Sequence, residues 1–171
     1  MSESLKSEFT IALDAMGGDL GPEIVILAAK ESLEKHQSLR IVFFGKEKEL
    51  VALCKKNISD QKRIKIVDAQ DVVEMSDSPV DSIRNKKNSS MRIALDYVKE
   101  KKADACVSAG NTGALMATAK FVLKMLPGIN RPAIIAELPA KKKTVHMLDL
   151  GANITNDPEQ LFQFALMGSI V

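Results

Sequence analysis

Residues 107–114, Val-Ser-Ala-Gly-Asn-Thr-Gly-Ala, constrain the fold more than any other part of the chain. The short apolar run that precedes them, residues 103–107, is typical of a buried strand. After them, apolar residues recur at spacings of three and four, which predicts one face of a helix. Gly110 and Gly113 lie between the two elements and allow the backbone to turn sharply. The sequence therefore predicts a strand, a glycine-containing loop and a helix in direct succession.

The start of this predicted helix has the properties of an anion-binding site. The N–H groups of a first helical turn have no partner within the helix, and the positive end of the helix dipole lies beside them. Ser108, Asn111 and Thr112 add side-chain donors at the same point. Such a loop suits a phosphate or a carboxylate. The alternative interpretation is that Asn111 or Thr112 only caps the helix.

Composition limits the classes of protein to consider. A chain of 171 residues that is 46% hydrophobic can bury the core of about one domain. A net charge of +2 and the scarcity of aromatic residues argue against nucleic-acid binding. His36 and His146 form no metal-ligand cluster with Cys54 and Cys106, and Cys106 fits a buried strand better than a catalytic role. Neither a signal peptide nor a long apolar stretch is present, so a soluble cytoplasmic protein is expected.

Predicted strands and helices mostly alternate along the chain. The predicted strands cover residues 9–13, 40–44, 63–67, 103–107, 133–138 and 144–150. This order indicates an α/β fold with a largely parallel sheet between layers of helices. Residues 1–8 are expected to be a flexible N-terminus, and residues 9–171 a single α/β domain. The lysines at 141–143 are expected at a solvated hairpin tip between the last two strands.

Three polar loops follow predicted strands, at residues 14–21, 108–113 and 149–153. In open α/β sheets, ligands bind at the edge where the carboxyl ends of the strands lie. We therefore expect the three loops to converge on one anion site. Gly17 and Gly18 in the first loop provide a second set of backbone donors for it.

A basic segment accompanies these loops. Residues 68–88 show little periodicity and contain Pro79, which predicts a long irregular loop. Its end places Arg84, Lys86 and Lys87 just before a helix. Cations repel one another and are unfavourable near a helix N-terminus unless an anion lies there. The segment is therefore a candidate part of the anion site, with a solvated basic turn as the alternative.

The common nucleotide and hydrolase motifs are absent from the sequence. No G-x-G-x-x-G follows a predicted strand, and the chain has neither a G-x-x-x-x-G-K-[ST] loop nor a G-x-S-x-G elbow. Any chemistry is therefore expected to depend on positioning and electrostatics.

Five segments, in this order, resemble the PlsX family of bacterial phosphate acyltransferases. They are D-A-M-G-G-D-x-G-P at 14–22, R-x-K-K-N-S-S-M at 84–91, S-A-G-N-T-G-A at 108–114, R-P-A at 131–133 and D-L-G-A-N at 149–153. The resemblance implies a three-layer α/β/α sandwich related to isocitrate and isopropylmalate dehydrogenases. It also implies that acyl-[acyl-carrier-protein] and inorganic phosphate are converted to acyl phosphate and free carrier protein. Family members act as homodimers loosely associated with the cytoplasmic membrane.

Members of this family are about twice as long as this chain. The resemblance therefore implies a domain that is truncated at its C-terminus. In addition, the apolar end Ile170-Val171 carries no helix-stop signal, so the chain is expected to stop inside the helix that begins near Asp157.

The implied reaction assigns roles to the candidate residues. Phosphate must be held near a thioester carbonyl while the developing oxyanion is stabilised. Asn111 and Lys86 are the expected catalytic residues, and no metal or organic cofactor is required. The expected phosphate- or substrate-binding residues are Gly17, Gly18, Arg84, Ser108, Gly110, Thr112, Gly113 and Asn153. Two alternatives remain open: a relative of the same fold that binds coenzyme A or a nucleotide, and a non-catalytic fragment.

Overall fold

The computed structural model describes residues 8–151, 153 and 155–171. The predicted flexible N-terminus lies outside this part of the chain, apart from Glu8, whose carboxylate pairs with Arg40 at 2.7 Å. Contacts divide the chain into two compact units, Met1–Leu123 and Lys124–Val171, and each is described here by itself. A single domain over residues 9–171 stays a prediction.

The first unit is built on a four-stranded parallel sheet in the order β3-β2-β1-β4. Its strands are β1 Phe9–Asp14, β2 Leu39–Gly45, β3 Ile64–Asp68 and β4 Ala105–Val107. Each predicted strand of this unit is confirmed to within two residues. Because all four strands are parallel, their carboxyl ends lie at one edge of the sheet.

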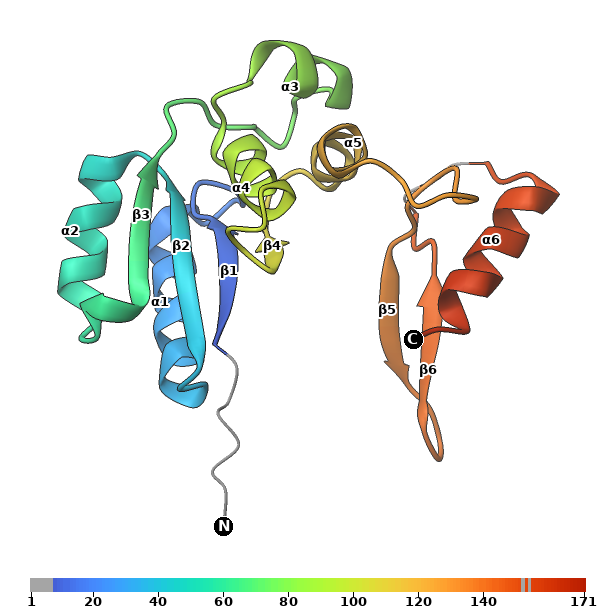
Figure 1. Cartoon of the computed structure of the whole chain (residues 1–171), viewed down its shortest axis with the longest axis horizontal. Helices are drawn as coiled ribbons and strands as arrows, with labels where there is room; N and C mark the ends of the chain where they lie inside the picture. Colours follow the sequence, from blue (N-terminus) through green and yellow to red (C-terminus); the bar gives the residue numbers. More distant parts are fainter. Residues whose placement is uncertain (1–7, 152, 154) are drawn as a thin grey trace. The chain divides into compact units, whose positions relative to one another are not determined.

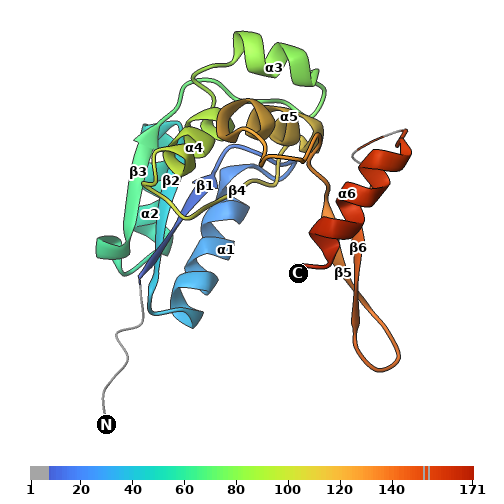
Figure 2. The same ribbon diagram turned by 45° about the vertical axis from the view of Figure 1, so that its right-hand side comes forward.

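Helices cover both faces of this sheet (Figures 1 and 2). They are α1 Gly21–Lys35, α2 Glu47–Asn57, the short 3-10 helix η1 Gln61–Arg63, α3 Pro79–Asn85, α4 Ser90–Lys99 and α5 Thr112–Leu123. Alternate strand residues face opposite layers. Phe43 packs in the core that α1 and α2 form, whereas Ala12 and Phe44 pack in the core that includes Ala94 of α4. The predicted three-layer α/β/α sandwich is confirmed.

One element corrects the sequence-based prediction. Residues 68–88 were expected to form a long irregular loop, but they contain the helix α3. Ser78 caps this helix by accepting a hydrogen bond from the Asp81 N–H at 3.1 Å, and Pro79 occupies its first turn. Both residue types are favoured at those positions. The helix is too short for its apolar spacing to be visible in the sequence, so its cap was the available signal.

The second unit contains an antiparallel hairpin and one helix. β5 Ile135–Pro139 pairs with β6 Thr144–Leu148, and the lysines at 141–143 lie exposed at its tip, as predicted. α6 Pro158–Gly168 begins at an Asp157 capping box. The expectation that the chain stops inside this helix is wrong, because α6 ends at Gly168. Ser169 forms its C-cap, with the backbone N–H donating to the carbonyl of Ala165 at 3.0 Å.

Candidate active site

Asp14, at the carboxyl end of β1, connects the first two predicted loops. Its carboxylate is 1% exposed and accepts hydrogen bonds from the N–H groups of Met16 and Gly17, both at 3.2 Å. It also accepts one from the Ser108 hydroxyl at 2.7 Å. The Ser108 oxygen in turn accepts a hydrogen bond from the Gly110 N–H at 3.1 Å. A buried carboxylate with charge-assisted hydrogen bonds thus fixes the conformation of both loops.

The two loops approach so closely that a side chain at Gly17 would clash with its neighbours. A Cβ atom at Gly17 would lie 2.7 Å from the Asp14 carboxylate and 2.9 Å from the Gly110 nitrogen. A Cβ atom added at Gly110 would lie 3.3 Å from the Gly17 Cα atom. The sequence predicted a sharp turn at Gly110 and a backbone donor at Gly17. In the structure they bring the two backbones together.

The N-terminus of α5 begins where this network ends. Asn111 caps the helix, because its side-chain oxygen accepts a hydrogen bond from the Ala114 N–H at 3.0 Å. Thr112 and Gly113, the next two residues, are exposed, and within the described part of the chain their N–H groups donate no hydrogen bond. Two backbone donors at the positive end of a twelve-residue helix therefore face outward.

Asn111 and Lys86 both contact one segment, residues 72–77. The Asn111 amide nitrogen lies 3.3, 3.0 and 2.9 Å from the carbonyl oxygens of Glu74, Met75 and Asp77. The Lys86 ammonium donates to the Val72 carbonyl at 2.7 Å and forms an ion pair with the Asp77 carboxylate. Their side chains are therefore bonded to protein groups, and their catalytic roles stay predictions.

A polar cavity of about 410 Å³ lies between this segment and the first glycine loop. Its lining residues are Met16, Gly18, Asp19, Val73, Glu74, Met75 and Ser76. Asp19 and Glu74 give this cavity a negative side, which by itself disfavours a phosphate. The sequence predicted a site role for the segment 68–88 through the cations at its end, but it did not single out residues 73–76, which carry no motif.

The two remaining predicted site residues, Arg84 and Asn153, lie in different units of the chain. Arg84 lies exposed in the last turn of α3, a helix that packs against α5. Asn153 belongs to the second unit, where its amide donates to the Asp149 carboxylate at 2.7 Å and its oxygen accepts from Arg131 at 3.3 Å. The structure thus joins the loops at 14–21 and 108–113. Convergence of the third loop with them stays a prediction.

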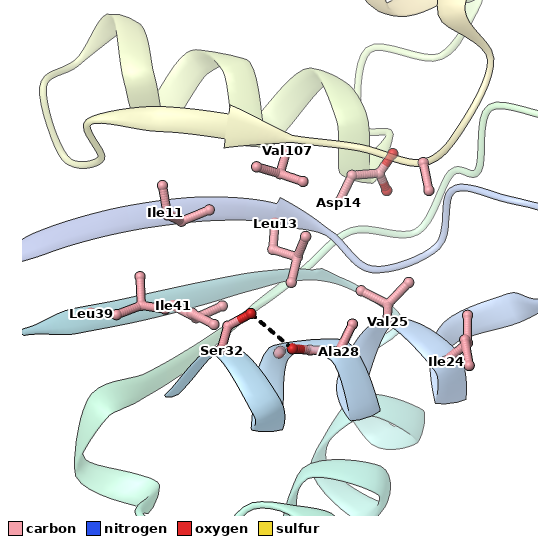
Figure 3. A pocket seen from close by; sticks show the side chains of 12 residues that line it. Ile11, Leu13, Asp14, Ile24, Val25, Ala28, Ser32, Leu39, Ile41 and Val107 are labelled. Carbon is pink, nitrogen blue, oxygen red and sulfur yellow. Dashed lines mark hydrogen bonds between the residues drawn. The ribbon is translucent and has the colours of Figure 1, made fainter. Parts of the chain in front are cut away.

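A second cavity, an apolar groove, lies beside α1 on the opposite side of β1 from α4 (Figure 3). Its volume is about 350 Å³. Ile24, Val25 and Ala28 of α1 form one wall, and Ile11 and Leu13 of β1 lie opposite (Figure 3). Val107 of β4 lines the same groove and is 49% exposed. The apolar face of the sheet is therefore uncovered where β4 forms its edge.

Titratable groups of the first unit give no sign of a reactive thiol. Burial, with a smaller contribution from the nearby Asp14 carboxylate, raises the pKa of the Cys106 thiol to about 12. Burial also raises the pKa of Cys54 to about 11.

In the described part of the chain, no group of three or more His, Cys, Asp or Glu side chains is arranged to hold a metal ion. No helix there is long and apolar enough to cross a membrane.

The fold is that of the phosphotransacetylases. A phosphotransacetylase from Streptococcus pyogenes superposes with a TM-score of 0.67 at 19% identity, over 93% of this chain and 52% of that structure. The EutD phosphotransacetylase from Staphylococcus aureus gives 0.60 at 20% identity, over 90% and 49% of the two chains. At these identities, the comparison defines the class of α/β fold.

The chain belongs to the fatty acid synthesis protein family, whose model matches residues 9–171. This match confirms the resemblance carried by the five segments. The phosphate acyltransferase of Methylococcus capsulatus is 57% identical over 162 residues, which are 93% of this chain and 47% of the relative. Phosphate acyltransferases of Coxiella burnetii (54%) and Shewanella baltica (52%) match over 95% and 96% of this chain. The chain spans about half the length of these curated relatives and matches their N-terminal half.

Proposed function

We propose that this chain provides the phosphate site of an acyltransferase that forms acyl phosphate from inorganic phosphate and an acyl-[acyl-carrier-protein] thioester. The observation that supports this most directly is the exposed first turn of α5. Its outward N–H groups follow a loop fixed by the buried Asp14–Ser108 hydrogen bond. The name of the relatives, phosphate acyltransferase, supports the same reaction class.

Phosphate binds at this turn through the N–H groups of Thr112 and Gly113 and the Thr112 hydroxyl. Helix N-termini are suited to this anion because their donors and dipole act together. Arg84, exposed on the neighbouring helix α3, adds a positive charge. Gly18 contributes from the first glycine loop, and Asn153 stays a predicted substrate-binding residue of the third loop.

The reaction needs little more than this arrangement. A phosphate oxygen attacks the thioester carbonyl carbon and forms a C–O bond, while the negative charge develops on the carbonyl oxygen. The C–S bond then breaks, and the carrier leaves as a thiolate, which requires no strong general acid. Fixed donors lower the barrier by holding phosphate close to the carbonyl and stabilising the oxyanion. Metal ions and organic cofactors take no part in these steps.

The acyl carrier protein is the proposed partner of the complete enzyme. The enzyme acts as a cytoplasmic homodimer that is peripheral to the inner face of the membrane, and its product is delivered into this membrane. A coenzyme A thioester is the second candidate donor, because the chain shares its fold with phosphotransacetylases. The two donors share the thioester and differ in the group that carries it.

The test joins this chain to the C-terminal half of the Methylococcus capsulatus relative. We expect the joined protein to form an extractable, radiolabelled acyl phosphate when it is supplied with acyl-[acyl-carrier-protein] and radiolabelled phosphate. We expect little or no product from residues 1–171 alone. Acyl-coenzyme A serves as the competing donor in a parallel reaction. Faster turnover of acyl-coenzyme A would support the second candidate. Release of carrier thiol at an equal rate without phosphate would overturn the proposal.

A further inference from the structure

The amide of Asn111 makes an unusual set of contacts for a helix cap. Its oxygen caps α5, while its two N–H donors are shared among three carbonyl oxygens of residues 74–77. Asn111 is only 9% exposed. Both ends of the amide are therefore occupied, and little of it remains for a ligand.

Residues 72–77 depend on such contacts because they lie outside the helices and strands of the structure. Their own hydrogen bonds are a turn, in which the Asp77 N–H donates to the Glu74 carbonyl at 3.1 Å, and a return bond from the Glu74 N–H to the Asp77 carboxylate at 2.7 Å. Lys86, the C-cap residue of α3, holds the same segment through Val72 and Asp77. Two side chains at the ends of two helices thus fix one irregular segment.

This segment forms one side of the polar cavity next to the first glycine loop. Val73, inside the segment, is buried in the same apolar cluster as Ala114 of α5. The cap of α5 and the cavity side are therefore connected both through the Asn111 amide and through the core. A displacement of residues 74–77 would disturb the first turn of α5, where the free N–H groups of Thr112 and Gly113 lie.

We propose that Asn111 is a positioning residue that clamps residues 74–77 to the start of α5, with Lys86 completing the clamp from the other side. Its effect on phosphate is indirect, because it orients the first turn of α5 and does not itself bind the anion. The clamp follows from the contacts alone. Its consequence for phosphate rests on the proposed function.

The experiment uses Asn111→Ser and Asn111→Asp in residues 1–171. Serine and aspartate both cap helices well, but neither can donate two N–H bonds to the carbonyls. Aspartate also places negative charge beside three carbonyl oxygens. We expect amide hydrogen exchange of residues 72–77, without phosphate, to accelerate about ten- to a hundred-fold in Asn111→Ser and further in Asn111→Asp. Asn88→Ser, at an exposed asparagine, is the matched control and should leave this exchange unchanged.

A phosphate titration of the Thr112 and Gly113 amide resonances completes the test. We expect the affinity for inorganic phosphate to fall in the two Asn111 variants together with the accelerated exchange. Weaker phosphate binding with unchanged exchange would make Asn111 a direct ligand and overturn the proposal. Unchanged exchange and unchanged affinity would overturn it as well. If the wild-type chain binds no phosphate but the exchange result holds, the clamp stands and the proposed function fails.

Lys86→Gln provides an independent readout of the same clamp. Because Lys86 and Asn111 hold one segment, their effects on its exchange should not be additive. We expect the double variant Lys86→Gln, Asn111→Ser to exchange much less rapidly than the product of the two single effects predicts. Additive effects would mean that the two side chains act on separate structures.

Discussion

The Ser108 hydroxyl donates a hydrogen bond of 2.7 Å to the buried carboxylate of Asp14, a residue 94 positions earlier in the chain. The two residues follow adjacent strands, β1 and β4, at the carboxyl edge of the sheet. Through this bond the loop before α1 and the loop before α5 become one structure. The geometry of the exposed α5 N-terminus therefore depends on the carboxylate of a residue that is only 1% exposed.

Replacement of Asp14 should be costly for this reason. Asp14→Ala removes the acceptor of two N–H groups and one hydroxyl, and we expect a loss of about 2–4 kcal/mol in the free energy of unfolding. Asp14→Asn should be much milder, because the amide oxygen can still accept the two backbone hydrogen bonds. Urea denaturation measures both, with Asp19→Ala, at an exposed neighbour, as the control. Equal stability of Asp14→Ala and Asp19→Ala would show that the network contributes little.

Gly17 in the first loop and Gly113 in α5 provide a contrasting pair of substitutions. Gly17→Ala would place a methyl group 2.9 Å from the Gly110 nitrogen, where backbone has to move, so a loss of about 1–3 kcal/mol is expected. Gly113→Ala meets nothing closer than 3.3 Å, from the Pro79 side chain, and lies in a helix. Alanine favours helix by up to about 1 kcal/mol over glycine, so Gly113→Ala should be neutral or stabilising. Thermal melts of both variants test the contrast, which a destabilised Gly113→Ala would contradict.

Arg84 should act on the ligand and not on stability. It is exposed, and within the described residues no hydrogen bond or ion pair fixes its guanidinium. We expect Arg84→Gln to weaken inorganic phosphate binding several-fold and to leave the melting temperature unchanged, because the charge is solvated in the free protein. Lys87→Gln, at an exposed neighbouring cation, is the control. Isothermal titration at low and high salt measures the effect, and a change in melting temperature with unaltered phosphate affinity would assign Arg84 to the fold.

The cysteines should be unreactive in the folded chain. A pKa of about 12 for Cys106 and about 11 for Cys54 leaves almost no thiolate at pH 8, so alkylation should be roughly a thousand-fold slower than for a free thiol at Cys106. Both thiols have a higher pKa in the folded chain than in the unfolded chain, and this difference contributes to the free energy of unfolding. The contribution is fully present below about pH 9 and is lost as the pH rises through the folded-state pKa values. Iodoacetamide labelling with and without denaturant tests this. Labelling of the native chain at the free-thiol rate would contradict it.

The apolar groove beside α1 should cause residues 1–171 to self-associate. Exposed apolar surface and an open edge strand both favour association, and β4 lies at the edge of the sheet. We expect the chain to elute larger than a compact monomer, and expect Val107→Glu to reduce this association. Val80→Glu is a matched control, since Val80 on α3 is 55% exposed, against 49% for Val107. A monodisperse wild-type monomer in light scattering would refute this prediction.

Local sequence patterns were sufficient to predict the class of fold and the family. Apolar periodicity and turn residues are local properties, so they located the strands, most helices and the loops that follow β1 and β4. The five segments identified the family because their order and spacing can be read directly from the sequence. Even the missed helix α3 had a local signal in its Ser78 cap. At the C-terminus, the apolar Ile170 and Val171 were misleading, because α6 ends at Gly168, before these two residues.

Tertiary structure decided how the site residues are used. Gly17 was predicted to supply a backbone donor and Gly110 to allow a sharp turn, and in the structure the two glycines let the two loops approach each other closely. Asn111 looked like a cap or a phosphate donor, and its amide reaches carbonyls 34–37 residues earlier in the chain. Lys86 was predicted to act on the anion, and its ammonium is paired with Asp77. These outcomes depend on distances between segments remote in sequence, and local residue patterns carry no information about such distances.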